Sequence, residues 1–115
     1  MEKTIKIGEK EITMKATGNT PKRYREEFNK DLIVEYQNLL RQIDDNGNFT
    51  ENADLGVVER LAYTMAKQHD SNIGTLDDWL DQFGVMDIFN AVAQIFSVWV
   101  ASSETLSDSK KKADQ

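Results

Sequence analysis

Residues 85–100 constrain the fold of this chain more than any other segment, because they are apolar over most of a helical surface. At about 100° per residue, one stripe contains Ile88, Val92, Ile95 and Trp99, and the stripe beside it contains Phe89, Phe96 and Val100. The apolar arc is about twice the roughly 100° that a surface helix requires. We therefore expect the central helix of the domain here, and the excess apolar surface favours a binding protein over a catalyst.

The charge of the chain is uneven along its 115 residues. Residues 44–87 carry two Lys or Arg against ten Asp or Glu, whereas residues 1–43 carry nine against seven. A stretch this acidic repels phosphate backbones, so we expect no nucleic-acid partner. A solvated surface is the default interpretation of this acidic stretch, and a docking surface for a basic partner is the alternative.

No apolar run reaches the roughly 18 residues that span a membrane, and the first residues lack the apolar core of a signal peptide.

The remaining patterns predict a mainly α fold with a short amino-terminal β-hairpin, in the α+β class. Charged and apolar residues alternate on either side of Gly8, which predicts a hairpin over residues 3–16. Apolar residues then recur at helical spacing. The predicted helices, about four around a central C-terminal helix, cover residues 21–43, 54–68, 76–83 and 85–101.

The predicted helix boundaries have local signals, and the chain is long enough for one domain. Thr20 before Pro21 is typical of a helix start, and Thr75 with Asp78 has the form of a capping box. We expect a single globular domain over residues 1–103. Residues 104–115 are polar and aperiodic, which predicts a flexible tail.

The residues that could support catalysis or bind a metal lack the additional ligands or the general base that such a site requires. His69 is the single histidine and there is no cysteine, so a zinc site is not expected. The acidic loop at residues 44–48 fits neither frame of a calcium-binding loop, and it predicts a helix-ending turn instead. A nucleophile would have only His69 as a conventional base. The sequence therefore predicts no enzyme, no cofactor and no metal.

The candidate functional residues are apolar and belong to the last strong helix. Aromatic residues at helical spacing are most often core residues, yet exposed ones dominate the energetics of interfaces. Four residues are therefore candidates for binding a partner: Phe89, Phe96, Trp99 and Val100.

Four blocks of sequence occur in a recognisable order. They are residues 16–31 (ATGNTPKRYREEFNKD), 61–67 (LAYTMAK), 76–83 (LDDWLDQF) and 88–99 (IFNAVAQIFSVW). Together they resemble the tail assembly chaperones of long-tailed phages and prophages of Gram-positive bacteria. In that family a short β-hairpin precedes a T-P-x-x-Y-R-x-x-F-x-x-D helix start, and an apolar helix ends near a tryptophan. The resemblance covers roughly residues 3–100.

The resemblance implies a non-enzymatic assembly factor in the cytoplasm of the bacterial host. Such a protein binds the tape measure protein, keeps it soluble and promotes assembly of the tail tube protein around it, and it is absent from the mature virion. A frameshifted longer product is also common in the family, and Lys110–Lys112 could be encoded by a slippery codon run. A homo-oligomer is compatible with this role. Two alternatives stay open: a structural head–tail or tail component, and a small acidic inhibitor or nucleic-acid mimic.

Overall fold

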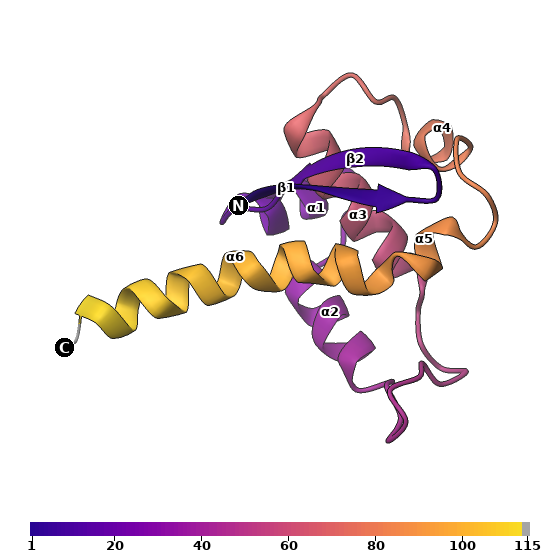
Figure 1. Cartoon of the computed structure of the whole chain (residues 1–115). Helices are drawn as coiled ribbons and strands as arrows, with labels where there is room; N and C mark the ends of the chain where they lie inside the picture. Colours follow the sequence, from indigo (N-terminus) through magenta and orange to yellow (C-terminus); the bar gives the residue numbers. More distant parts are fainter. Residues whose placement is uncertain (114–115) are drawn as a thin grey trace.

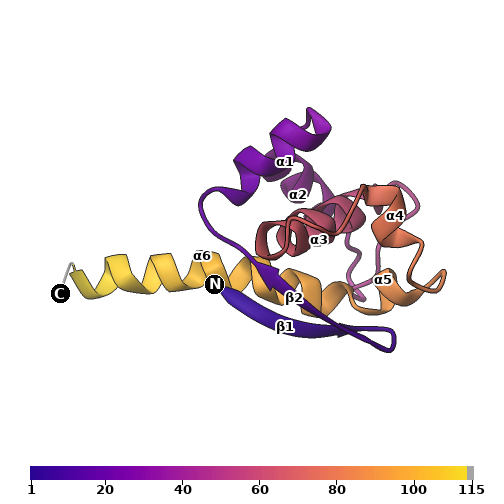
Figure 2. The same cartoon turned by 90° about the horizontal axis from the view of Figure 1, so that it is seen from above.

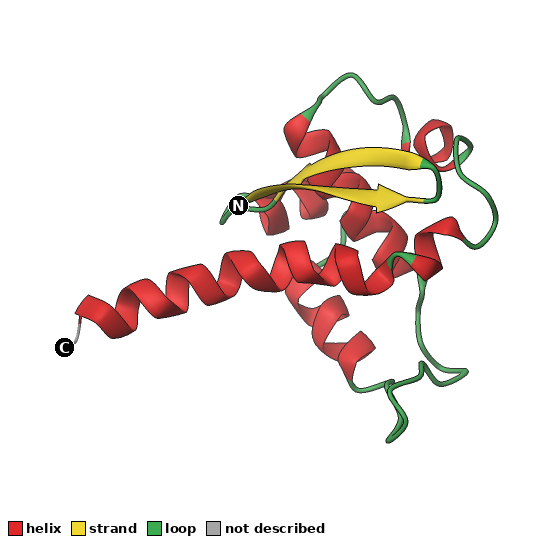
Figure 3. Ribbon diagram, viewed as in Figure 1, coloured by secondary structure: helices red, strands yellow, loops and turns green. Residues whose placement is uncertain are grey.

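The computed structural model describes residues 1–113, with side chains up to Ser102, as a β-hairpin followed by helices (Figures 1 and 3). The predicted α+β, mainly helical class is confirmed. The strands are β1 (Glu2–Ile7) and β2 (Lys10–Lys15). The helices are α1 (Thr20–Phe28), α2 (Leu32–Leu40), α3 (Gly56–His69), α4 (Leu76–Leu80), α5 (Asp87–Asn90) and α6 (Val92–Ala113). Within this range no helix is both long enough and apolar enough to cross a membrane.

The β-hairpin forms where the alternating pattern predicts it. The strands are antiparallel, with Ile5 opposite Ile12 and Ile7 opposite Lys10. Gly8 takes a positive φ of 60° at the first position of the two-residue loop, which a glycine adopts at no steric cost. A Cβ on Gly8 would also lie 2.4 Å from a carboxylate oxygen of Asp87, so any other residue here would require the Asp87 side chain at the start of α5 to move.

The central element of the fold is α3, not the C-terminal helix. It contacts β2 and all five other helices, and most of its side chains are buried. A helix that is apolar on nearly all sides is stable only when other elements surround it. Its small residues, such as Ala62 and Ala66, allow these neighbours to approach closely.

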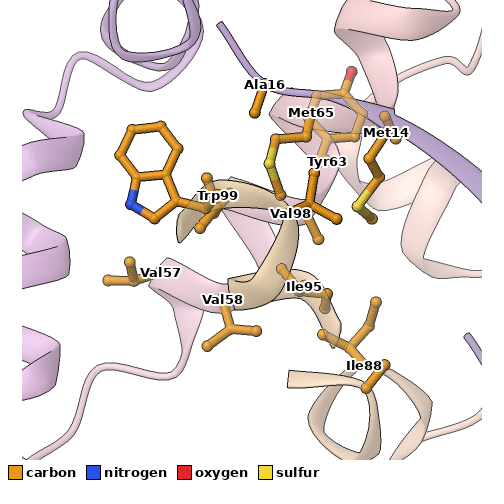
Figure 4. Packing of buried hydrophobic residues seen from close by; sticks show 14 of the residues in the cluster. Met14, Ala16, Val57, Val58, Tyr63, Met65, Ile88, Ile95, Val98 and Trp99 are labelled. Atoms are coloured by element: carbon orange, nitrogen blue, oxygen red, sulfur yellow. The ribbon is translucent and has the colours of Figure 1, made fainter. Parts of the chain in front are cut away.

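The core is a single cluster around α3 (Figure 4). The hairpin contributes Met14 from β2, α5 contributes Ile88, and α6 contributes Ile95 and Val98. All four side chains converge with those of α3 in the close-up view. The last helix therefore supplies one wall of the core.

The predicted helix over residues 21–43 is two helices, because three polar residues interrupt it. Asn29 adopts the left-handed conformation at φ 56° and its N–H bonds to the carbonyl of Arg25, which ends α1. Asp31 then accepts a hydrogen bond from the Val34 N–H at 3.1 Å and begins α2. The hydroxyl of Thr20, expected to cap α1, instead accepts from Thr17 N–H and donates to Gln68.

The predicted helix over residues 85–101 is also divided. Ala91 leaves the helical region, with φ −98° and ψ 5°, and its N–H bonds to the carbonyls of both Asp87 and Ile88. The helix α6 then continues to Ala113, so the expected flexible tail is helical through most of residues 104–115. Its C-terminal half extends beyond the other elements (Figures 1 and 2). Residues 114–115 lie outside the described residues.

A mostly buried polar cluster joins the first three helices. Arg60 of α3 donates through Nε to Tyr24 Oη of α1 at 2.8 Å, and its guanidinium lies 3.4 Å from the Glu35 carboxylate of α2. The Tyr24 hydroxyl donates to Glu35, while Asp54 accepts from Arg60 at 3.1 Å. Burial, followed by the hydrogen bond to Glu35, raises the pKa of Tyr24 well above its usual value. The phenol therefore stays protonated and keeps donating.

We predict that Arg60→Met lowers the free energy of unfolding by about 2–3 kcal/mol, because it leaves the Glu35 carboxylate without its main partner. The matched control is Lys22→Met, which removes the exposed ion pair with Glu26 and should cost less than about 0.5 kcal/mol. Urea denaturation monitored by circular dichroism measures both values. Equal losses in the two variants would contradict a structural role for the cluster.

Candidate partner-binding surface

The second helix exposes large apolar side chains on the face beside its buried edge. Leu32 and Leu39 are buried in the core, whereas Ile33 and Leu40 are 42% and 43% exposed. Ile33, Tyr36 and Leu40 recur at i, i+3 and i+7, so they lie on one helical face. Exposed apolar residues gathered on one face are characteristic of interaction sites.

Tyr36 connects this face of α2 to α6. Its ring lies edge-on to Phe96, with centroids 5.5 Å apart, and edge-on to Trp99 at 6.0 Å. Edge-to-face pairs of this kind are favourable beyond the area they bury. Burial raises the pKa of the Tyr36 phenol. Through Tyr36, the apolar face of α2 is therefore in contact with α6.

We define the α2–α6 surface by five residues: Ile33, Tyr36, Leu40, Phe96 and Val100. The α6 members and Tyr36 are partly buried against the core and partly accessible. The two exposed aliphatic residues of α2 lie on either side of Tyr36 along the helix. The result is an apolar surface with an aromatic centre, formed by two helices that also pack into the same core.

The structure separates the four residues predicted to bind a partner. Phe96 and Val100 are partly buried against the core, and they are included in the α2–α6 surface because Phe96 contacts Tyr36 and Val100 lies one turn further along α6. Trp99 is only 7% exposed and is a core residue, so it is not accessible to a partner in this conformation. Phe89 lies on α5 and is partly exposed, close in sequence to the exposed residues Val85 and Met86. Among the described side chains, the ring contacts of Phe96 and Trp99 are with Tyr36 and not with Phe89.

Sequence reasoning missed the contribution of α2. Leu32-Ile33 and Leu39-Leu40 are adjacent apolar pairs, and a narrow helix face can bury only one member of each. This signal was available in the sequence. The apolar periodicity across residues 21–43 hides it, because a single long helix would place all of these residues in the core.

The polar residues considered for catalysis or metal binding have structural contacts. The Asp44 carboxylate accepts the N–H groups of Asn46 and Asn48 at 2.9 and 3.0 Å, which holds the turn after α2. His69 Nδ1 lies 3.4 Å from a carboxylate oxygen of Glu2. Among the described residues, no group of three or more metal-ligating side chains is placed to hold an ion.

Comparison of the chain with protein-family models, with curated proteins and with solved structures finds no match.

We predict that Tyr36→Ala and Leu40→Ala differ in their effect on stability. Tyr36→Ala should lower the free energy of unfolding by about 2 kcal/mol, because it removes the ring that packs on Phe96 and Trp99. Leu40→Ala should cost less than about 1 kcal/mol, since its side chain is already well exposed. Chemical denaturation of the two variants measures the difference. A larger loss for Leu40→Ala would show that Leu40 is a core residue rather than part of a free surface.

Proposed function

We propose that this protein is a phage tail assembly chaperone that binds helical segments of the tape measure protein through the α2–α6 surface. The observation that carries the proposal is the apolar α2–α6 surface, whose two helices meet where the rings of Tyr36 and Phe96 pack together. The sequence blocks that resemble the chaperone family support it independently.

The shape of the surface suits a helical partner. Two helices that meet at an aromatic contact leave apolar side chains on each side of the contact, and an amphipathic helix can place its i, i+3, i+4 and i+7 residues against such a surface. Phe96 and Tyr36 at the centre would be desolvated most completely. Aromatic side chains in that position contribute most of the binding free energy in many interfaces.

The charge near this surface fits a protein that must remain soluble with an apolar face exposed. The acidic turn after α2 contains Asp44 and Asp45, and Glu51 follows it. Net negative charge opposes association between copies of the chain, because like charges repel.

A tape measure protein is long and largely helical, with apolar faces that would otherwise self-associate. In this proposal the chaperone covers those faces in the host cytoplasm, promotes assembly of the tail tube protein and is released before the particle is complete.

The two alternatives differ in what they require of the surface. A nucleic-acid mimic requires carboxylates spread over most of the molecule, whereas α1 exposes Lys22, Arg23 and Arg25. A structural tail component would use the same apolar surface but would keep its partner permanently. The location of the protein in finished particles therefore distinguishes chaperone from structural component.

We predict that Ile33→Asp combined with Leu40→Asp weakens binding to a tape measure fragment at least about 30-fold, corresponding to about 2 kcal/mol, because two charges would enter an apolar contact. A matched control uses Val34→Asp. Val34 is 50% exposed on the same helix but on a different face, and an acidic residue is favourable in the first turn. Isothermal titration calorimetry measures the three affinities. Equal weakening by the control would exclude a specific role for the α2–α6 surface.

We also predict that mature virions lack this protein, while cell extracts taken during assembly contain it bound to the tape measure protein. Quantitative mass spectrometry of gradient-purified particles and of affinity-purified complexes makes the comparison. A fixed number of copies in every particle would favour the structural alternative.

A further inference from the structure

The outer edge of β2 has backbone groups directed away from β1. Met1 and Ala16, next to the hairpin ends, exchange two hydrogen bonds of 2.9 and 2.8 Å. In an antiparallel ladder such pairs alternate with pairs that exchange none. Following the register inward, Ile5 and Ile12 are bonded to each other, whereas Thr13 and Glu11 direct their N–H and C=O groups outward. These outward groups are available to a further strand.

The opposite edge of the hairpin is occupied at one of its outward-directed residues. The side-chain amide of Gln94 on α6 donates to the carbonyl of Lys6 and accepts from its N–H, both at 3.4 Å. Lys6 is the outward-directed residue of β1 opposite Glu11. Figure 1 shows α6 running beside β1, with β2 on the side of the connection between α3 and α4. The two edges of the hairpin therefore differ in accessibility.

A groove of about 460 Å³ follows the free edge of β2. Its strand side is formed by Glu11, Ile12 and Thr13. The facing side is formed by the end of α3, by the following connection and by α4, and it contains apolar side chains of Ala66, Ile73 and Trp79. Its volume lies in the range of about 300–1,000 Å³ that is typical of ligand sites. A strand beside β2 would thus meet main-chain partners on one side and apolar side chains on the other.

The charge of the groove indicates the chemistry of the occupant. Glu11, Asp70 and Asp78 line it, and its described lining residues include no Lys or Arg. The ring of His69, which also lines it, lies against Glu2. An occupant with Lys or Arg side chains would complement these carboxylates. A second copy of a chain with net charge −6 is less suited to the same position.

We propose that the free edge of β2 binds an extended segment of a partner protein as a third strand, with alternating aliphatic and basic side chains. Main-chain hydrogen bonds to Glu11 and Thr13 would hold the segment, as in other cases of strand addition. Aliphatic side chains on one face would enter the groove over Ile73 and Trp79. Basic side chains on the other face would lie beside Glu11. This site is separate from the α2–α6 surface and goes beyond the proposed function.

The test uses a synthetic hexapeptide of alternating valine and lysine, blocked at both ends, titrated into the isotopically labelled full chain and followed by nuclear magnetic resonance. Binding should shift the amides of Glu11 and Thr13 and the indole N–H of Trp79, and it should slow hydrogen exchange of the Thr13 amide. The same peptide with glutamate in place of lysine, and one with methylated backbone nitrogens, should each bind at least about tenfold more weakly. Equal binding of all three peptides would overturn the proposal.

Two proline variants provide a matched comparison. Thr13→Pro removes an outward N–H from the β2 edge and leaves the bonds to β1 intact, as proline is tolerated at sheet edges. Thr4→Pro makes the same change on the opposite strand, and each variant removes the same Thr4–Thr13 hydroxyl contact. Only Thr13→Pro should weaken binding of the valine–lysine peptide, by at least about tenfold. Equal affinity of the two variants would overturn the proposal.

Three further measurements complete the test. If Thr13→Pro unfolds, Glu11→Lys preserves the backbone and should still weaken the valine–lysine peptide severalfold; an unchanged affinity would count against the site. The Ile33→Asp and Leu40→Asp variant should bind this peptide normally, which separates failure of this proposal from failure of the chaperone function. Sedimentation showing a dimer that Thr13→Pro dissociates would assign the edge to a second copy and overturn the proposal.

Discussion

The burial of α3 on nearly all sides is the constraint on which the other elements depend. Because β2, α1, α2, α4, α5 and α6 each cover part of α3, all of these elements are placed by their contact with the same buried helix. Arg60 also sets the orientation of the first helices, because its guanidinium binds Tyr24 of α1 and Glu35 of α2. The hairpin and α2 each cover their own part of α3. The outer surfaces of the hairpin and of α2 are therefore separate, because the two elements pack on different parts of α3.

Local signals in the sequence predicted the elements that depend on short-range chemistry. Alternation around Gly8 predicted the hairpin, and Thr75 with Asp78 forms the expected capping box of α4. The interruption at Asn29 and Asp31 had signals of the same kind, a left-handed cap followed by an N-cap. The apolar periodicity continues across them and hides the interruption. Periodicity alone does not distinguish one long helix from two helices in similar phase.

The position of the core could not be predicted in the same way, because burial depends on what surrounds a helix. Residues 85–101 have the widest apolar arc, which favoured a central position, yet the shorter and less apolar α3 is the more deeply buried helix. Consequently Trp99 is a core residue, whereas Ile33 and Leu40 are exposed. Phe96 and Val100, which the sequence predicts as candidates for binding a partner, are partly accessible in the structure. Their neighbours on α2 became recognisable only with the contact between Tyr36 and Phe96.

Gln94 has a consequence for how this protein behaves at high concentration. A fibril of stacked sheets grows only if each molecule offers two unpaired edges, one to the molecule before it and one to the molecule after it. The amide of Gln94 occupies main-chain positions of β1 that such a neighbour would need. Edge pairing on the β1 side would therefore have to displace this side chain from Lys6. A single side chain thus makes the two edges of the hairpin unequal, and it disfavours the repeated edge-to-edge stacking that a fibril requires.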